Sequence, residues 1–205
     1  LGTALLLFTT TVAMLYVATN QPRYVVIGTL TFAAVSWVAS RTVPRFGIRL
    51  QNWVDPWGDP LATGYQQVQS EYALAAGGAL GVGLGRGDPT RIPDIHTDFV
   101  LTAIGEELGL GGTLAVIGLL LLVSLRAFQI ALRAPAGVGR FLAAGLGTSV
   151  AVQTLLIAGG VARLVPLTGL TLPFVSYGGT AMIVNFFIVG LLLTVSSNDL
   201  RPRST

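Results

Sequence analysis

The chain has 205 residues, of which 52% are hydrophobic and only 10% are charged. This composition excludes an ordinary soluble two-layer domain and indicates an integral membrane protein whose solvent is the bilayer. The net charge of +3 comes from arginines scattered over several connectors, a pattern that does not support nucleic-acid binding. Cysteine is absent, which excludes a thiol nucleophile, a disulfide framework and a thiolate metal site.

Five apolar stretches approach the length of about 20 residues that a helix needs to cross a bilayer. They lie at residues 1–19, 24–40, 99–125, 141–161 and 174–195. The first lacks the basic start and small-residue cleavage site of a signal peptide, so a spanning helix is the preferred interpretation. Leu1 lies inside an apolar run, which indicates a fragment of a longer protein. We predict a single all-α polytopic membrane domain over residues 1–205.

The connectors between these stretches predict the orientation of the protein. Residues 41–98 form one large polar loop, whereas the other connectors are short. Arginine is concentrated in the short connectors of one side and in the tail, and the opposite short connector holds only Arg163. Because arginine favours the cytoplasmic side of short loops, residues 196–205 are predicted to be a cytoplasmic tail and residues 41–98 an extracytoplasmic loop.

Within the large loop, residues 53–60 contain two Asp-Pro turns and two tryptophans, a pattern typical of a membrane interface. Residues 65–76 are predicted to form a short helix on the bilayer surface, with Val68, Tyr72, Ala75 and Ala76 at helical spacing. Residues 77–87 are rich in glycine, and residues 81–87 could cradle a phosphate through their N–H groups, but they lack the Gly-Lys-Ser/Thr ending of a nucleotide-binding loop.

The carboxylates at the third stretch are the candidates for chemistry. Zinc catalysis is excluded because His96 is the only histidine, whereas an oxygen-bound cation such as Mg²⁺ remains compatible. Asp98 lies at the mouth of the predicted helix, and Glu106 lies ~12 Å deeper and ~80° around the axis, so the two are not a contacting pair. Ionisable groups at membrane depth mark function by default. The alternatives are structural pairing for Glu106 and Glu107, and a helix-dipole charge for Asp98.

Four blocks of sequence resemble the signatures of the FtsW/RodA/SpoVE (SEDS) family of cell-wall polymerases. They are QNWVDPW (51–57), GYQ (64–66), HTDF with GEELG (96–109) and PLTGLTLPFVSYGG (166–179). The resemblance implies a ten-helix fold in the bacterial plasma membrane, of which this chain would be helices six to ten. It implies polymerisation of lipid II into peptidoglycan strands together with a class B penicillin-binding protein, in elongation, division or sporulation. Division-type members usually read PEAHTD where this chain reads PDIHTD (93–98), so the subgroup stays open.

The resemblance also implies roles for individual residues. Asp98 matches the essential aspartate before the eighth helix and would be the general base. A divalent cation (Mg²⁺ or Mn²⁺) or the loop arginines would stabilise the leaving pyrophosphate, and no organic cofactor is implied. The residues predicted to bind substrate are Arg86, Arg91, His96, Thr97, Glu106, Glu107, Ser176 and Tyr177.

One further expectation follows from the same resemblance, and two rival functions remain open. The fragment alone would be inactive because the first five helices, which help to line the substrate cavity, are missing. The chief rival function is a lipid II flippase or transporter that uses Glu106 and Glu107 as its path. A third function is a non-catalytic scaffold that holds a partner synthase.

Overall fold

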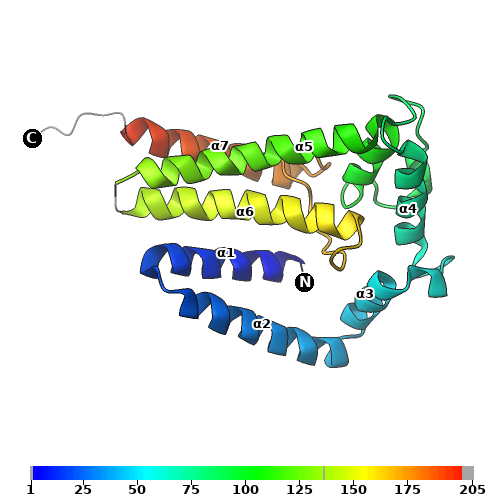
Figure 1. Ribbon diagram of the computed structural model, residues 1–205, viewed down its shortest axis with the longest axis horizontal. Helices are drawn as coiled ribbons and strands as arrows, with labels where there is room; N and C mark the ends of the chain where they lie inside the picture. The colour runs from blue at the N-terminus through cyan, green and yellow to red at the C-terminus, as the bar shows by residue number, and fades with distance from the viewer. Residues whose placement is uncertain (1, 136, 200–205) are drawn as a thin grey trace, which may run out of the picture.

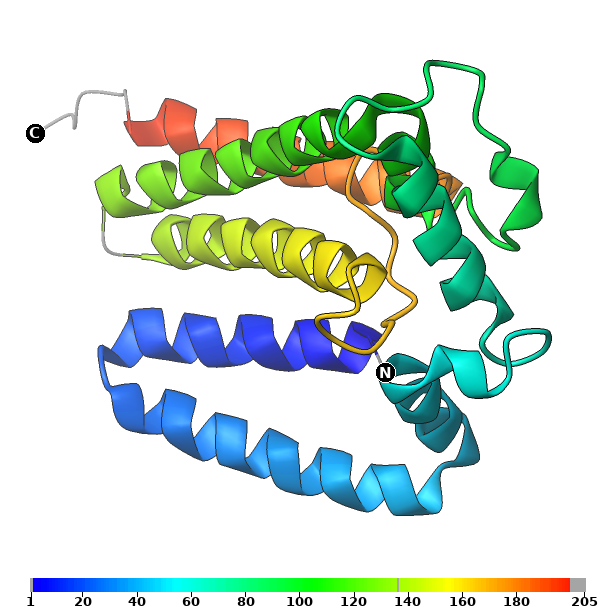
Figure 2. The ribbon, with the colours of Figure 1, turned by 45° about the vertical axis from the view of Figure 1, so that its right-hand side comes forward.

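The computed structural model describes residues 2–135 and 137–199, and within these ranges the secondary structure is entirely helical. Five helices are long and apolar enough to cross a membrane, which confirms the predicted all-α polytopic fold. They pack side by side, and spans that follow one another in the chain run in opposite directions (Figures 1 and 2). They are α1 (Gly2–Thr19), α2 (Pro22–Thr42), α5 (Val100–Arg133), α6 (Val138–Val161) and α7 (Gly179–Asp199).

The helix boundaries are set by local backbone chemistry. Asn20 ends α1 in the left-handed region, with φ at 53°, and Pro22 begins α2 where its missing N–H is not needed. The prediction that the fifth span starts at residue 174 is wrong, because α7 begins only at Gly179. Phe174 has a φ of 62°, and the turn that it forms separates α7 from the preceding segment.

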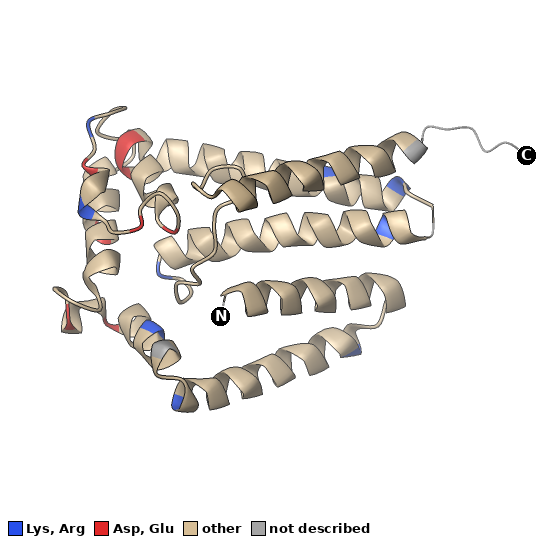
Figure 3. Cartoon of the chain, turned by 180° about the vertical axis from the view of Figure 1, so that it is seen from behind, with Lys and Arg blue, Asp and Glu red and all other residues tan. Residues whose placement is uncertain are grey.

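The two ends of the bundle differ in structure and charge. The α1–α2 and α5–α6 connections and the end of α7 lie together at what we call the short-turn end (Figure 1). The opposite, large-loop end holds residues 43–99 and 162–178. Figure 3 shows acidic residues gathered at the large-loop end and arginines present at both ends. The cytoplasmic placement of the short-turn end remains a prediction from arginine counts in the short connectors.

The large loop is more ordered than the sequence predicts. It contains α3 (Pro44–Val54), η1 (Pro56–Gly58), α4 (Tyr65–Gly77) and η2 (Pro89–Arg91). The helix predicted at residues 65–76 is confirmed as α4, whereas α3 was not predicted. Helix α4 packs on α5 and buries Val68, while Tyr72, Ala75 and Ala76 are exposed, so the four residues do not form one buried face.

Helices α5 and α6 form the centre of the bundle and approach closely through small side chains. Ala143 and Thr154 are completely buried between their neighbours. A Cβ added at Gly147 would lie 2.8 Å from the Cβ of Ala127, so a larger residue would push the helices apart. Small residues allow such close contact in membrane bundles, where burial of apolar surface supplies little driving force between helices.

Helix α5 is broken at Gly109, whose φ of 69° and ψ of −169° are accessible essentially to glycine alone. The N–H of Leu110, just after the break, donates to the carbonyl of Gly78 at 2.9 Å. Residues 110–133 are by themselves long enough to cross a bilayer. Glu106 and Glu107 precede the break and therefore lie towards the large-loop end, away from the middle of the span.

The glycine-rich residues 77–87 pack on the broken part of α5. The N–H groups of Val82 and Gly83 donate to the carbonyls of Glu106 and Glu107 at 2.9 and 3.0 Å. A side chain at Gly81 would collide with the Glu107 carbonyl, which explains the need for glycine there. These donors are used within the fold, so this structure does not support the phosphate-cradle hypothesis for this segment.

We predict that Gly109→Ala destabilises the protein by about 2–4 kcal/mol, because the new Cβ would strain the backbone and lie 2.6 Å from the Ala79 carbonyl oxygen. Gly118→Ala is the matched control, since that glycine lies in the same helix with open space around it. The control should be neutral or slightly stabilising. Thermal unfolding in detergent measures both, and equal melting temperatures would contradict the prediction.

Candidate functional site

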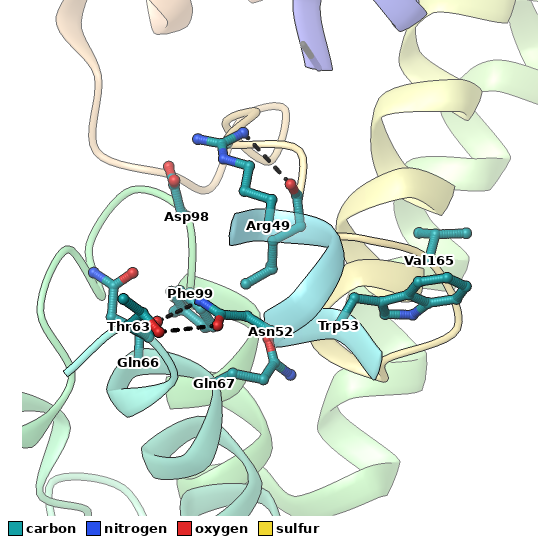
Figure 4. Close-up of a pocket in the computed structure, with 11 residues that line it drawn as sticks. Arg49, Asn52, Trp53, Thr63, Gln66, Gln67, Asp98, Phe99 and Val165 are labelled. Atoms are coloured by element: carbon teal, nitrogen blue, oxygen red, sulfur yellow. Dashed lines mark hydrogen bonds between the residues drawn. The ribbon is translucent and has the colours of Figure 1, made fainter. Parts of the chain in front are cut away.

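Asp98 lines a cavity of about 100 Å³ at the large-loop end of the bundle (Figure 4). Its walls come from three parts of the chain that are distant in sequence: helix α3, the start of α4 with the turn before it, and residues 165–169. Half of the residues that line the cavity with Asp98 are polar. The polar lining residues are Arg49, Asn52, Thr63, Gln66 and Gln67.

Asp98 is held in place by a turn and a buried anchor. Its backbone N–H donates to the carbonyl of Asp94 at 3.1 Å, and Asp94 itself has a left-handed φ of 56°. The next residue, Phe99, is buried with 2% of its surface exposed. Asp98 thus precedes α5 at a fixed position while its carboxylate reaches the cavity.

The segment before α7 braces the same turn from the other side. The Ser176 hydroxyl donates to the Thr97 carbonyl at 2.6 Å and accepts from the N–H of Leu172 at 2.8 Å. The N–H of Tyr177 donates to the His96 carbonyl at 2.8 Å. Ser176 is buried, and its hydrogen bonds hold the turn that carries Asp98 in place.

Burial raises the pKa of the Asp98 carboxyl above its ordinary value, and the nearby charge of Asp94 acts in the same direction. A hydrogen bond with Thr97 and the positive charge of Arg49 lower the pKa and offset only part of this rise. The carboxyl is half-buried and still borders the cavity. A carboxylate with a raised pKa is a stronger proton acceptor, as general-base chemistry requires.

Arg49 is the cation that shares this cavity with Asp98. Its Nη1 donates to the carbonyl of Leu167 at 3.5 Å (Figure 4) and to that of Thr168 at 3.2 Å, and these two bonds fix the guanidinium. A Cβ on Gly169 would lie 3.3 Å from Arg49 Nη2 and 3.5 Å from Asp98 Oδ2. The cation and the carboxylate therefore face one space beside Gly169, without a direct ion pair among the residues described.

The two loop arginines predicted to bind substrate do not line this cavity. Arg91 pairs with Asp88 at 2.7 Å, and both side chains are largely exposed. The Thr90 hydroxyl and Arg91 lower the pKa of Asp88. The side chain of Arg86 lies beside Gly83, in the glycine-rich segment.

The other predicted residues also lie outside the Asp98 cavity. Glu106 Oε1 accepts from the backbone N–H of Asp88 at 3.3 Å. His96 and Glu107 border a second hollow of about 230 Å³. His96 and the exposed Tyr177 border a third, largely apolar hollow of about 400 Å³. The Thr97 hydroxyl donates to the Asp94 carbonyl at 3.0 Å within the turn.

Sequence reasoning did not select Arg49 and Asn52 as site residues. A signal was present, because Arg49 and Asn52 are three residues apart, as on one face of a helix. Asn52 is tied to Thr63 across the cavity, where the Thr63 hydroxyl donates to Asn52 Oδ1 at 3.2 Å. No helix was predicted at this point of the large loop, so the shared face of Arg49 and Asn52 was not recognised.

A divalent cation could be held here only with help from the substrate. In residues 2–135 and 137–199 no three histidine or acidic side chains gather into a metal-binding group. Asp98 is the one carboxylate among the residues that line the cavity. A hard cation at this position would therefore be bound by Asp98 and by phosphate oxygens, which are ligands that Mg²⁺ favours.

The fold and the cavity define a polytopic helical membrane protein with a polar site at one end of its bundle. The family described as "Cell cycle protein" (FtsW/RodA/SpoVE) matches residues 1–200, and the chain belongs to that family.

Named relatives agree with this assignment. The chain is 43% identical over 205 residues to "Peptidoglycan glycosyltransferase RodA" of Mycobacterium tuberculosis, covering all of this chain and 44% of that protein. It is 39% identical over 199 residues to "Probable peptidoglycan glycosyltransferase FtsW" of Geobacter sulfurreducens, covering 96% of this chain and 53% of the relative. The chain thus spans about half the length of the curated relatives it matches.

A solved structure has the same fold. It is described as "Structural coordination of polymerization and crosslinking by a peptidoglycan synthase complex", and it matches with a TM-score of 0.78 and 27% sequence identity. The match covers 98% of this chain and 57% of the other.

Proposed function

We propose that this chain is the catalytic C-terminal part of a peptidoglycan glycosyltransferase that polymerises lipid II, working with a class B penicillin-binding protein. The observation that carries the proposal is that Asp98 and Arg49 both line one polar cavity. The family membership and the names of the relatives supply the reaction class.

The two side chains fit the two requirements of glycosyl transfer from a lipid pyrophosphate. The acceptor hydroxyl oxygen bonds to the anomeric carbon of the donor sugar as the bond from that carbon to the pyrophosphate oxygen breaks. Asp98 takes the hydroxyl proton, and the bonding electrons leave with the pyrophosphate. Arg49, fixed by two carbonyls, stabilises the negative charge that develops there. A bound Mg²⁺ or Mn²⁺ would add positive charge at the same oxygens.

The volume of the cavity limits what this part of the protein binds. Pockets for drug-sized ligands are typically about 300–1,000 Å³, several times larger than this one. The cavity therefore has room only for the reacting groups, and the remaining sugars and the lipid lie outside it. The rest of the substrate site is proposed to come from the parts of the relatives that this chain does not cover.

The test is to purify the full-length gene product with its penicillin-binding partner and supply labelled lipid II with Mg²⁺ or Mn²⁺. We expect glycan chains on a gel. Transfer of lipid II across vesicle membranes without glycan product would establish the flippase instead. Partner binding with neither product nor transfer, from protein shown to be folded, would establish the scaffold.

A further inference from the structure

Arg163, at the start of the segment that follows α6, joins three elements at the large-loop end. Its Nη2 donates to the carbonyls of Trp53 and Val54, each at 3.1 Å. Its Nη1 forms an ion pair with Glu71 Oε1 at 2.9 Å. In return, the indole Nε1 of Trp53 donates to the Arg163 carbonyl at 2.9 Å. Arg163, which belongs to the α6–α7 segment, thus bonds to the end of α3 and to α4.

The backbone at this position favours glycine rather than arginine. Arg163 has a φ of 57°, which costs a residue with a side chain about 1 kcal/mol or more. The contacts of its side chain offset this cost. The carbonyls of Trp53 and Val54 are the last of α3, where the helix dipole attracts a cation. The side chains of Arg163 and Glu71 are only 30% and 25% exposed, so water screens the pair incompletely.

Helix α3 depends on such bonds for its orientation. Its main neighbours among the helices are α2 and the short η1, and neither of these carries Asp98. Towards Asp98, α3 is held by side chains: Arg49 on the Leu167 and Thr168 carbonyls, and Arg163 on the last turn. Arg49, in the middle of α3, thus binds the α6–α7 segment, and Arg163 of that segment binds the C-terminal end of α3.

We propose that Arg163 is a positioning residue that orients α3, so that the Arg49 guanidinium faces Asp98 across the cavity. The three elements that Arg163 joins are the three that supply the cavity walls besides Asp98 and Phe99. A small rotation of α3 about its contact with α2 would move Arg49 away from Gly169. Displacements of about 1 Å can cost an enzyme a hundredfold in rate, so a residue outside the cavity controls the geometry within it.

Three variants of the full-length protein separate positioning from mere stability. Arg163→Gly removes every side-chain bond and also relieves the backbone strain; we expect kcat/KM for lipid II to fall at least about tenfold with little change in melting temperature. Arg163→Lys keeps the charge without the fork of donors and should recover part of the rate. Glu71→Gln leaves the bonds to α3 and should lower kcat/KM less than about threefold. The control is Arg133→Gln, an exposed arginine at the short-turn end.

The activity test rests on the proposed function. A spectroscopic measurement tests the position of α3 without measuring activity. This segment has no cysteine, so nitroxide labels can be placed at exposed Ile48 in α3 and exposed Ala75 in α4, after any cysteine elsewhere is replaced. We expect the distance distribution between them to broaden in Arg163→Gly and stay narrow in Glu71→Gln.

Two outcomes overturn the positioning role. The first is a distribution of label distances in Arg163→Gly that stays narrow. The second is a broadened distribution in Arg163→Gly together with an unchanged kcat/KM. If the unmodified protein makes no polymer, the proposed function fails, and the label distances alone then decide whether Arg163 orients α3.

Discussion

Asp98→Asn is expected to lower kcat for lipid II polymerisation by about 10²–10⁴-fold, because the amide cannot accept the proton of the acceptor hydroxyl. Asparagine has nearly the same shape as aspartate, so the turn before α5 and the packing of Phe99 should survive. The measurement is the rate of glycan formation by the purified full-length protein with its partner. A rate equal to that of the unmodified protein would remove the proton-accepting role from Asp98.

The effect of Asp98→Asn on the free energy of unfolding also has a predicted direction. Burial raises the pKa of Asp98, so the folded state binds its proton more tightly than the unfolded state does. The free energy of unfolding therefore falls as pH rises from the ordinary aspartate pKa through the raised one, and it stays lower above it. Asp98→Asn should remove this dependence, with a melting temperature at neutral pH equal to or above that of the unmodified protein. A clear loss of stability at neutral pH would show a structural role instead.

Asp94→Asn is the matched control for both measurements. Asp94 lies four residues earlier, is exposed, and has the left-handed backbone that asparagine tolerates. We expect this variant to retain polymerisation. Because the Asp94 charge raises the pKa of Asp98, its removal should move the acid limb of the pH–rate profile slightly to lower pH.

Arg49→Gln is expected to lower kcat/KM by about a hundredfold to a thousandfold, because it removes the fixed positive charge beside the departing pyrophosphate. Arg49→Lys keeps a charge but loses the fork that binds the Leu167 and Thr168 carbonyls, so its loss should be smaller. Arg133→Gln is again the control, and its kcat/KM should match that of the unmodified protein.

The pH dependence of Arg49→Gln separates its electrostatic effect from simple misfolding. The charge of Arg49 lowers the pKa of Asp98, so its removal lets that pKa rise further. The base is then protonated over a wider range, and the acid limb of the pH–rate profile should move to higher pH. The measurement is kcat/KM on labelled lipid II across a pH series. An unmoved limb together with an unchanged rate would place the pyrophosphate elsewhere.

The sequence by itself determined the class of protein and the position of Asp98. A helix in lipid must satisfy its own backbone hydrogen bonds, so each span is a local run of apolar residues and can be recognised without knowledge of its neighbours. The predicted start of α7 was wrong because the turn at Phe174 is also apolar. Hydropathy alone does not distinguish such a turn from a helix. The HTDF block likewise identifies Asp98 from adjacent residues, which need no tertiary contact to be recognised.

Only the tertiary structure decided which positively charged side chain lies near Asp98. Arg86 and Arg91 are nearer to Asp98 in the sequence, yet Arg91 pairs with Asp88 and Arg86 lies in the glycine-rich segment. Arg49 is much more distant along the chain, and it reaches the cavity because α3 is held against the α6–α7 segment by contacts between remote residues. Gly109 decided the position of Glu106 and Glu107 in the same way, by breaking α5 where the glycine-rich segment packs on it. Such contacts depend on distances in space rather than on local spacing, and composition and periodicity carry no record of them.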